Sequence, residues 1–342
     1  MGKNILVTGG AGFIGSNFLN FWSSNYPQDK LIVLDKVTYA ANPLTINYLK
    51  DLKVIFIKGD IANKDLVQNL LKNYQITHIV NFAAESHVDR SISSPKNFFK
   101  TNLEGTFNLL NTYHEYWKDM GSNKDWRFLH ISTDEVFGSL KINDEKFNEY
   151  TPYFPRSPYS ATKAGSDHLV MAWFHTYGLP VIISNCSNNY GPYQHPEKLI
   201  PKTIINGLKG KEIPIYGNGE NIRDWLFVSD HVNALEKIII KALPGSRYCI
   251  GGKDEINNID LVNIICEILD RVKKNPDIKN RKKLVKFVKD RPGHDFRYSI
   301  NSSLLERDLN WLQQVSLIKG LEETIKWYIL NEDWWHSIPF NH

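Results

Sequence analysis

The sequence contains few cysteines, no long apolar run and no strong excess of charge of one sign. Its three cysteines, among 342 residues, lie in apolar surroundings without the spacing of a zinc site or a disulfide framework. We therefore expect reduced, buried thiols, no bound metal and a cytoplasmic location. An apolar stretch of about 18 residues, the length that spans a bilayer, is also missing, so the sequence predicts no membrane contact.

The charge is balanced and gives no sign of a nucleic-acid partner. Lysine and arginine total 41, aspartate and glutamate total 37, and the formal net charge is +4 at pH 7. Such a small excess is compatible with attraction of an anionic small ligand, but it is not concentrated in a basic patch. We interpret the densest basic run, residues 281–283, as a solvated turn.

Short apolar runs alternate with helical patterns through the first half of the chain. Each run has the length of a strand and indicates burial on both faces. Because strands that alternate with helices form right-handed crossovers, the expected fold class is α/β, a doubly wound parallel sheet or Rossmann fold. The expected strands cover residues 5–7, 31–34, 54–57, 78–82, 128–131 and 181–183, and the expected helices cover 13–24, 65–73, 95–117 and 160–177.

After about residue 187 the pattern becomes less regular. We assign residues 1–187 to a Rossmann domain and residues 188–342 mainly to a smaller α/β lobe, interleaved with the first and returning some segments to it. The tryptophan-rich segment 327–335 is interpretable either as internal packing or as an oligomer contact. The expected strands of this half cover residues 213–216, 225–228, 248–250 and 284–288, and the expected helices cover 232–243, 261–272 and 317–330.

A glycine-rich loop between the first predicted strand and helix indicates a dinucleotide site. Gly9, Gly12 and Gly15 would allow a tight turn, close approach of the backbone to a pyrophosphate, and close packing of helix on sheet. Asp35, at the end of the second strand, would accept hydrogen bonds from the ribose diol of NAD and repel the extra phosphate of NADP. The sequence therefore predicts NAD as cofactor; the alternative is a glycine turn that binds nothing.

Other small and polar residues follow neighbouring strands at the same edge of the sheet. Asp60 follows the third predicted strand, and Ala83 and Ala84 follow the fourth. Open parallel sheets bind ligands at the carboxyl ends of their strands. The two alanines would let a cofactor lie against the backbone, whereas Asp60 is equally interpretable as a helix N-cap.

An acidic pair and a tyrosine–lysine pair indicate proton-transfer chemistry. Tyr159 and Lys163 are one helical turn apart, and the ammonium should favour the phenolate and make the tyrosine a usable base. Asp134 and Glu135 follow the fifth predicted strand. Removal of water from a sugar would use an acid and a base of this kind, with pKa values that like charges drive apart. The alternative is that the acidic pair only caps a turn.

Together these motifs resemble those of the extended short-chain dehydrogenase/reductase family. The resemblance is greatest to its nucleotide-sugar 4,6-dehydratases, in particular to members acting on dTDP-glucose, and it extends from residue 5 to about residue 300. Phe137 stands where tyrosine is common in this family, and Ala41 stands where glycine is common, and neither changes the assignment. The resemblance is carried by residues 8–15, 83–90, 101–102, 132–138, 158–163, 188–194, 196–201, 223–225 and 290–295.

The resemblance implies further binding residues. Arg223 and Arg291 would pair with a diphosphate, because guanidinium groups match phosphate geometry, although either is alternatively an interior ion pair. The cofactor residues implied are Gly9, Gly12, Phe13, Ile14, Gly15, Asp35, Lys36, Thr38, Asp60, Ile61, Ala83, Ala84, Ser86, Thr101, Tyr159, Lys163 and Asn189. The substrate residues implied are Ser86, Thr133, Asn188, Lys198, Leu199, Pro214, Tyr216, Arg223, Asn258, Arg291 and Tyr298.

For the reaction, the resemblance implies oxidation of a nucleoside-diphosphate hexose at carbon 4 by bound NAD. Tyr159 would take the proton of the 4-hydroxyl, assisted by Lys163 and Thr133. Glu135 would then remove the proton of carbon 5, and Asp134 would protonate the departing 6-hydroxyl. Return of the hydride to carbon 6, with a proton going back to carbon 5, would complete the conversion to a 4-keto-6-deoxy sugar.

The resemblance also implies a homodimer, joined by a four-helix bundle of helices 95–117 and 160–177 from two subunits. The first of these helices carries more apolar side chains than one buried face requires. Those side chains are Phe98, Phe99, Leu103, Phe107, Leu109 and Leu110.

Three other functions remain open. The sugar could carry UDP, CDP or GDP in place of dTDP, because dehydratases for other nucleotides use the same motifs. A 4-epimerase or a decarboxylase of the same family would share Tyr159 and Lys163 but would have no need of the Asp134–Glu135 pair. A non-catalytic NAD-binding regulator would not need to retain Tyr159 and Lys163.

Overall fold

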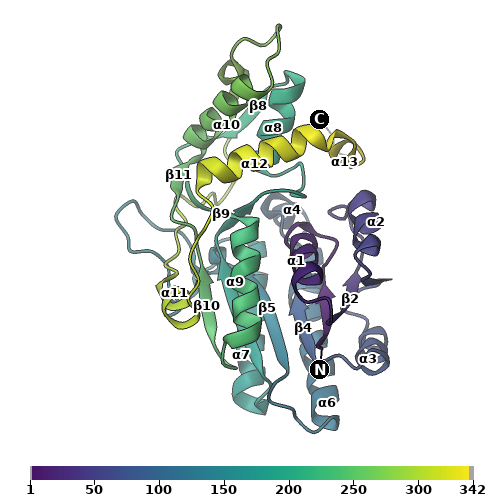
Figure 1. The fold of residues 1–342 in the computed structure, drawn as a ribbon. Coiled ribbons are helices and arrows are strands. Elements are labelled where there is room, and N and C mark those ends of the chain that lie inside the picture. The colour runs from purple at the N-terminus through teal and green to yellow at the C-terminus, as the bar shows by residue number, and fades with distance from the viewer. Residues whose placement is uncertain (1, 339–342) are drawn as a thin grey trace.

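A seven-stranded parallel sheet forms the centre of the larger of two lobes in the computed structural model, which describes residues 2–338 (Figure 1). From one edge to the other its strands are β10 (Arg247–Ile250), β6 (Val181–Cys186), β5 (Arg127–Thr133), β4 (His78–Asn81), β1 (Asn4–Thr8), β2 (Lys30–Asp35) and β3 (Ile55–Lys58). The chain winds outward from β1 in both directions, so the predicted doubly wound sheet is confirmed. The point of reversal, where open sheets bind ligands, lies between β1 and β4.

Helices cover both faces of this sheet because each has an apolar stripe to bury. One face is covered by α1 (Phe13–Asn25), α9 (Val228–Lys241) and α11 (Ser303–Leu309), and the other by α3 (Lys64–Asn73), α6 (Thr106–Asp119) and α7 (Pro158–Tyr177). Phe18 and Trp22 of α1 are fully buried on the first face, as are Leu109 and Leu110 of α6 on the second. The two apolar layers hold the sheet in place, and with it the carboxyl ends of the strands, where the predicted motifs lie.

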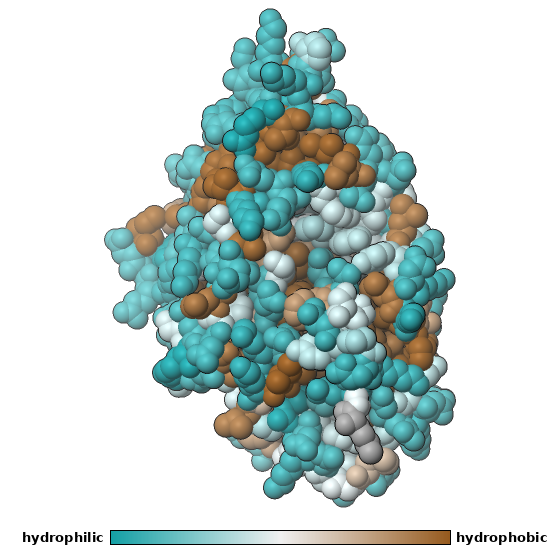
Figure 2. Space-filling view, in the orientation of Figure 1, coloured by the Kyte–Doolittle hydropathy of each residue, from teal (hydrophilic) through white to brown (hydrophobic). Residues whose placement is uncertain are grey.

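The smaller lobe lies over the carboxyl ends of the strands, at the top of Figure 1. It contains a three-stranded sheet of β7 (Asn188–Tyr190), β9 (Ile222–Phe227) and β11 (Glu255–Asn257), and a parallel pair of β8 (Ile213–Tyr216) and β12 (Val285–Val288). Its helices are α8 (Leu199–Lys209), α10 (Asn258–Val272), α12 (Leu317–Leu330) and α13 (Glu332–His336). Figure 2 shows an apolar band on this lobe, over α12, where Ile318 and Leu330 are exposed.

The tryptophan-rich segment near the end of the chain packs inside the molecule. Trp334 and Trp335 are buried, and the Trp334 ring lies edge-on to Trp327, with 5.0 Å between ring centroids. Trp334 Nε1 donates to Thr45 Oγ1 at 2.8 Å, and Asn42 Nδ2 donates to the Trp334 carbonyl at 2.6 Å. Of the two interpretations of this segment, the structure therefore supports packing, which joins the smaller lobe to helix α2 (Pro43–Asp51).

Two expectations about burial were wrong. Strand β3, at one edge of the sheet, is only partly buried, whereas β10, at the other edge, is mostly buried. Arg281 does not lie in a solvated turn: its side chain is 1% exposed. Its Nη1 lies 2.6 Å from Asp270 Oδ1, and its Nε donates to the Gly207 carbonyl at 2.9 Å. These partners of Arg281 come from other parts of the fold, so the run of basic residues alone did not indicate them.

The helical segment predicted at 95–117 is divided into three parts. It begins at Pro95 as expected, with α5 (Pro95–Phe98), continues as a π-helical stretch over Phe99–Gly105, and becomes regular again in α6. The periodicity of apolar residues did not indicate this change of winding. Helices α2 and α4 (Val88–Ser93) were not predicted either. Both are short and follow loops at the carboxyl edge of the sheet.

The expectation that the three cysteines are reduced, buried thiols is confirmed. Cys186, Cys249 and Cys266 are free and buried. Among the described residues, no helix combines the length and the apolar character needed to cross a membrane. Residues 2–338 also contain no group of three or more histidine, cysteine, aspartate or glutamate side chains placed to hold a metal ion.

Candidate active site

Two adjoining cavities lie between the sheet edge and the smaller lobe. The first is lined by the glycine loop, the ends of β2 to β5 and the start of α7, and the second by residues of α4, α8, β8 and β9. Every residue predicted for the cofactor lines the first cavity. The predicted substrate residues line the second, apart from Thr133, which lines the first. Glu135 lines both, so the acidic pair lies where the cavities meet.

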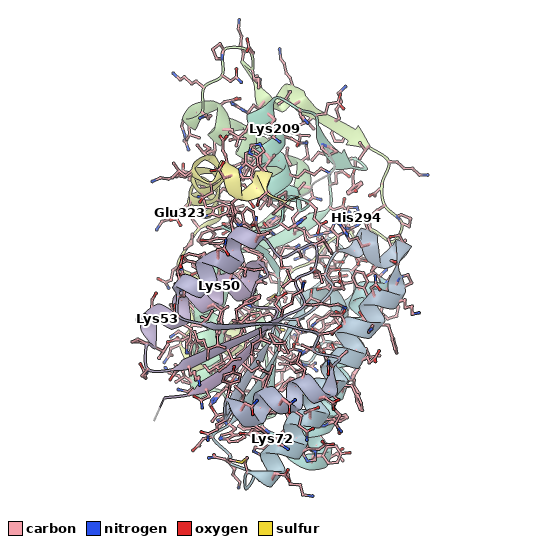
Figure 3. The ribbon with its side chains drawn as sticks, turned by 90° about the vertical axis from the view of Figure 1, so that its right-hand side faces the viewer. Lys50, Lys53, Lys72, Lys209, His294 and Glu323 are labelled. Carbon is pink, nitrogen blue, oxygen red and sulfur yellow. The ribbon has the colours of Figure 1, made fainter. Side chains whose placement is uncertain are left out.

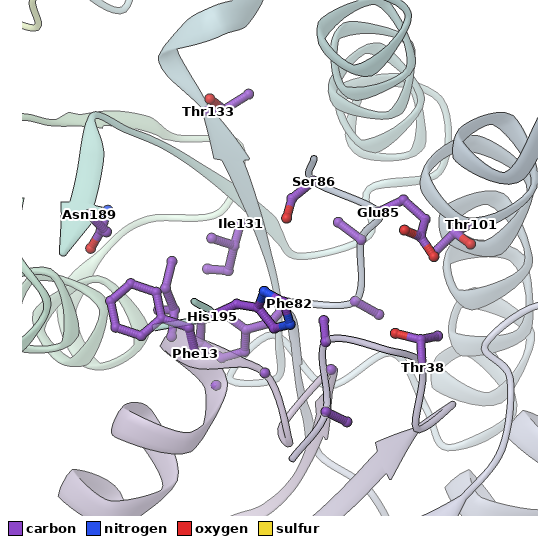
Figure 4. Close-up of a pocket in the computed structure, with 18 of the residues that line it drawn as sticks. Phe13, Thr38, Phe82, Glu85, Ser86, Thr101, Ile131, Thr133, Asn189 and His195 are labelled. Atoms are coloured by element: carbon purple, nitrogen blue, oxygen red, sulfur yellow. The ribbon is translucent and has the colours of Figure 1, made fainter. Parts of the chain in front are cut away.

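The glycine loop forms a cradle that side chains would fill. Gly9 has a φ of +68°, and a Cβ there would lie 2.7 Å from the Ala83 amide nitrogen. A Cβ on Gly15 would lie 2.5 Å from the Gly9 carbonyl oxygen. Glycine has no Cβ to collide with these backbone atoms, so the loop can turn tightly and pack closely where it leads into the N-terminus of α1, which lines the first cavity. The N-terminus of a helix is suited to an anion such as a pyrophosphate. The wall opposite Glu85, Ser86 and Thr101 carries Asn189 and His195 (Figure 4).

The two aspartates that follow β2 and β3 organise this cradle. Asp35 Oδ2 accepts from the Ala11 amide at 2.9 Å and Oδ1 from the Val37 amide at 2.8 Å, so the carboxylate ties the glycine loop to the end of β2. Asp60 pairs with Lys36, with 2.8 Å between Oδ2 and Nζ, and accepts from the Ala62 amide. The N-cap of the next helix is Asn63, so the N-cap interpretation of Asp60 was wrong.

Thr133 is the residue that caps the turn after β5. Its Oγ1 accepts from the Glu135 amide at 3.3 Å at the start of a short 3-10 helix, Asp134–Phe137. The acidic side chains are therefore not the cap, and that alternative was wrong. Asp134 is 2% exposed, and its Oδ2 forms no hydrogen bond among the described residues. A buried carboxyl oxygen without a partner is costly unless the group is protonated or meets a ligand.

The surroundings give the two carboxyl groups different acidities. Burial, followed by the charge of Glu135, raises the pKa of Asp134 to about 8. Burial also raises the pKa of Glu135, but the positive charges of Arg291, Arg223 and Lys198 act against it. Asp134 therefore holds a proton at neutral pH, whereas Glu135 faces three cations that favour its ionised form. The two carboxyl groups therefore lie in different electrostatic surroundings, and their roles as acid and base stay a prediction.

Tyr159 and Lys163 share the buried start of α7, which Ser157 caps with a reciprocal capping box. Lys163 Nζ donates to the Ile131 carbonyl at 2.7 Å. Burial, followed by the charge of Glu135, raises the pKa of Tyr159 well above its usual value, while a hydrogen bond with Thr133 acts in the opposite direction. Burial is thus the main cause of the raised pKa of Tyr159, and the lowering expected from Lys163 stays a prediction.

The second cavity has a cationic wall. Arg223 is buried and donates to the carbonyls of Ile222, Asp295 and Phe296, while its guanidinium lies 4.4 Å from the centre of the Tyr298 ring. These partners carry no charge, so the interior ion pair considered for Arg223 was wrong.

Arg291 does have an acidic neighbour at this wall, since its Nη1 lies 3.8 Å from Asp89 Oδ1. His294, at the junction of the lobes in Figure 3, lies 2.7 Å from Asp290 Oδ1. Arg223 and Arg291 together supply positive charge where a diphosphate would lie.

Sequence reasoning missed a cluster at the edge of both cavities. Glu197 lies 3.4 Å from Arg90 Nη2, 3.5 Å from His87 Nε2 and 3.6 Å from His195 Nδ1. The Arg90 guanidinium lies over the ring of Tyr39 at 3.6 Å. A signal for Glu197 was present in motif 196–201, whereas nothing in the sequence marked Tyr39, which comes from the loop after β2.

The Rossmann sheet, the glycine cradle and the buried tyrosine–lysine pair define a nucleotide-dependent enzyme of the short-chain dehydrogenase/reductase type. Residues 6–324 match the family described as GDP-mannose 4,6 dehydratase, and the chain therefore belongs to that family.

Relatives of this chain include dehydratases and an epimerase. It is 48% identical to dTDP-glucose 4,6-dehydratase of Escherichia coli over 347 residues, which cover 98% of this chain and 96% of that protein. It is similar to the structure of dTDP-glucose 4,6-dehydratase from Streptomyces venezuelae solved with NAD bound, with a TM-score of 0.89, 41% identity and coverage of 98% and 100%. UDP-glucose 4-epimerase from Thermotoga maritima has a TM-score of 0.84 at 25% identity, with coverage of 96% and 100%.

Proposed function

We propose that the protein is a dTDP-glucose 4,6-dehydratase, which converts dTDP-glucose into dTDP-4-dehydro-6-deoxy-glucose and water. The observation that carries the proposal is the buried Asp134–Glu135 pair where the two cavities meet: the pKa of Asp134 is raised to about 8, and Glu135 faces three cations. The relatives named dTDP-glucose 4,6-dehydratase support it over most of their length. The product would serve as a precursor of deoxysugars.

NAD fits the first cavity, because the glycine cradle is open at the N-terminus of α1 and Asp35 faces the position of an adenosine ribose. NAD, when bound, supplies reversible hydride transfer: it takes a hydride from carbon 4 of the hexose and returns it to carbon 6. The residues proposed to hold it are the cofactor residues predicted from the sequence, all of which line this cavity.

Each proton has a carrier among the residues of the site. Tyr159 takes the proton of the 4-hydroxyl, Lys163 stabilises the phenolate, and Thr133 orients the same oxygen. The ketone at carbon 4 acidifies carbon 5, from which Glu135 takes the proton. Asp134, protonated at neutral pH, gives its proton to the departing 6-hydroxyl. The proton held by Glu135 would go back to carbon 5 when the hydride is returned to carbon 6.

The second cavity, formed mainly by residues 188–342, is proposed to hold the nucleotide and diphosphate. Arg223 and Arg291 would pair with the diphosphate in this arrangement, since both line the cavity with their guanidinium groups. Residues 1–187 would then supply the NAD site and the catalytic groups. The remaining substrate contacts proposed are Ser86, Asn188, Lys198, Leu199, Pro214, Tyr216, Asn258 and Tyr298.

Incubation of the purified protein with dTDP-, UDP-, CDP- and GDP-glucose tests this function. Mass spectrometry should show loss of one water from dTDP-glucose in preference to the others. A product of unchanged mass would instead identify an epimerase, the activity named for the Thermotoga maritima structure. If water is lost only from another nucleotide sugar, the protein is a 4,6-dehydratase, but its substrate does not carry dTDP.

We expect the protein to bind NAD in preference to NADP. The Asp35 carboxylate lies at the end of β2, where it would repel a phosphate on the adenosine ribose. Nucleotide released by denaturing the purified protein should therefore be NAD, as chromatography against standards would show. Release of NADP, or failure of the protein to bind either nucleotide, would contradict this assignment.

We expect the dehydration step to slow as the pH rises through about 8. Burial and the charge of Glu135 raise the pKa of Asp134 to about this value. The sign follows from the role: the acid form of Asp134 is the active one, and it is present below this pKa and lost above it. The pH dependence of product formation measures this limb. In Asp134→Asn the rate should be lower, and the decline of the rate above about pH 8 should be absent. If the decline persists in this variant, it belongs to another titrating group.

The proposed assembly is a homodimer joined through the helical segment 95–119 and α7. Phe99 is 54% exposed and Phe107 is 46% exposed on this segment, whereas Phe98 is buried against its own lobe. Tyr177 of α7 is also exposed, so an apolar face remains on the outside of both helices. We expect light scattering to give twice the monomer mass of 39.5 kDa. Phe99→Lys with Phe107→Lys should shift the mass to the monomer, whereas a monomer before any substitution would refute the assembly.

The cytoplasm is the compartment we propose for this activity. The three cysteines are free and lie in the core, as expected for a protein kept in a reducing environment.

A further inference from the structure

A buried polar cluster surrounds the ammonium of Lys163 and takes no part in the proton transfers described above. His130 of β5 lies with Nε2 3.3 Å from Lys163 Nζ. Asp167, one turn after Lys163 on α7, lies with Oδ1 3.4 Å from the same His130 nitrogen. Both side chains are fully buried, and neither lines either of the two cavities described above. Their role must therefore be exercised through Lys163 and not on a ligand.

Asp167 is held as a carboxylate. Its Oδ2 accepts three hydrogen bonds, from Ser132 Oγ at 2.8 Å, Tyr153 OH at 2.7 Å and Asn185 Nδ2 at 3.2 Å. Burial alone would raise the pKa of Asp167, but hydrogen bonding, with His130 first and then with Tyr153, and the charge of Lys163 lower it overall. A buried carboxylate with this many donors keeps its charge through the whole working range of pH. Its Oδ1, which forms no other hydrogen bond among the described residues, faces His130.

His130 is neutral, and its tautomer is fixed by a chain of hydrogen bonds. Thr8 Oγ1 donates to Asn81 Oδ1 at 2.6 Å, which turns the Asn81 amide nitrogen toward His130 Nδ1 at 3.1 Å. Nδ1 therefore accepts, and the ring proton lies on Nε2. Burial, followed by the charge of Lys163, lowers the pKa of His130 to about 4. The ring therefore provides no charge that could balance the ammonium.

The other groups that face Lys163 are neutral as well. Burial raises the pKa of the Cys186 thiol of β6 to about 12, and burial raises that of Tyr159 well above 10. On its far side, Asp167 faces Tyr153, whose ring lies 4.8 Å from the Arg247 guanidinium. Of the groups that face the ammonium, Asp167 is thus the one that carries a negative charge at neutral pH. An ammonium that is fully desolvated loses its proton easily unless such a charge is near.

We propose that Asp167 is a positioning residue whose fixed negative charge, which lies beside the same His130 nitrogen as the ammonium, keeps Lys163 protonated and aligned with Tyr159. The inference rests on the proposed function, in which Lys163 must be charged to stabilise the Tyr159 phenolate. Both charges lie beside His130 Nε2. Ser166 ties the ring to the helix, because its Oγ accepts from Nε2 at 3.1 Å and donates to the Lys163 carbonyl at 2.8 Å.

Asp167→Asn tests this inference, because it removes the charge with little change of shape. In carbon-13-labelled lysine spectra of the NAD-loaded protein, the Lys163 signal is identified by its loss in Lys163→Met. Its titration midpoint should fall by about one pH unit or more in Asp167→Asn, a tenfold change in proton affinity per unit. Tyr153→Phe is the matched control: it removes a donor to Asp167 but no charge, and should leave the midpoint within a few tenths of a unit.

The oxidation of the sugar should report the same change. Loss of the Lys163 proton ends the activity at high pH, so the alkaline limb for oxidation at carbon 4 should move toward neutral pH by the same amount. A uniform loss of rate at every pH, with the Lys163 midpoint unchanged, would show a purely structural role and overturn the inference. If asparagine prevents folding, Asp167→Ser provides a second uncharged replacement. Should the protein fail to act on dTDP-glucose, the lysine titration still decides the inference separately from the function.

Discussion

Tyr159→Phe is expected to slow oxidation at carbon 4 by about 10²–10⁴-fold, the range typical for loss of a general base. The base is the phenolate form of Tyr159 on the buried face of α7, which takes the proton of the 4-hydroxyl, and phenylalanine keeps the ring but not the oxygen. Rapid-mixing measurements of the absorbance of reduced nicotinamide after addition of dTDP-glucose would follow this step directly.

Tyr113→Phe is a matched control for this substitution. Tyr113 is also fully buried and donates to the Thr77 carbonyl at 2.7 Å, but it lies on α6 and lines neither cavity. It should leave the rate of oxidation unchanged within about twofold, because the hydrogen bond that it loses contributes mainly to stability. If Tyr159→Phe reduces bound NAD as fast as the unmodified protein, the base is a different group.

Glu135→Gln is expected to stop the reaction after oxidation. The hydride leaves carbon 4 before the proton leaves carbon 5, so the cofactor should be reduced on addition of substrate and should then remain reduced, with no release of water. Glutamine keeps the size of the side chain but cannot accept the carbon-5 proton. Loss of 10²-fold or more in product formation, about the contribution of a general base, should accompany the persistent absorbance.

Glu149→Gln serves as the control for this second substitution. Glu149 is a largely buried carboxylate that accepts from the Cys249 amide at 2.9 Å, and it lines neither cavity. The control should turn over normally, with no lasting reduction of the cofactor. Normal turnover in Glu135→Gln would remove Glu135 from the mechanism, and absence of both reduction and product would place it in the first step or in substrate binding.

Arg281 and β3 show where sequence patterns fail. A basic run next to an expected strand reads as solvent-exposed, yet Arg281 finds Asp270 and two carbonyls that lie in helices α8 and α10 or just after them. An apolar run of strand length reads as buried, yet β3 lies at an edge of the sheet. In both cases burial depends on which elements become neighbours, and the local sequence does not contain that information.

The sequence by itself determined the sheet, the glycine cradle and the pairing of Tyr159 with Lys163. These features depend on short-range chemistry: apolar periodicity, the positive φ that glycine tolerates, and the 3.6-residue repeat that places positions 159 and 163 on one face. The residues expected to surround a cofactor were brought together by the carboxyl ends of strands, which a parallel topology aligns at one edge.

Only the tertiary structure decided the acidities of the site. Asp134 is adjacent to Glu135 in the chain, but its pKa of about 8 results from burial, and Glu135 meets the positive charges of Lys198, Arg223 and Arg291, which come from distant segments. The same holds for Tyr159, whose pKa is raised by desolvation in spite of the lysine on its own helix. Desolvation and charge–charge interactions depend on distances through space, which are set when the smaller lobe closes over the sheet.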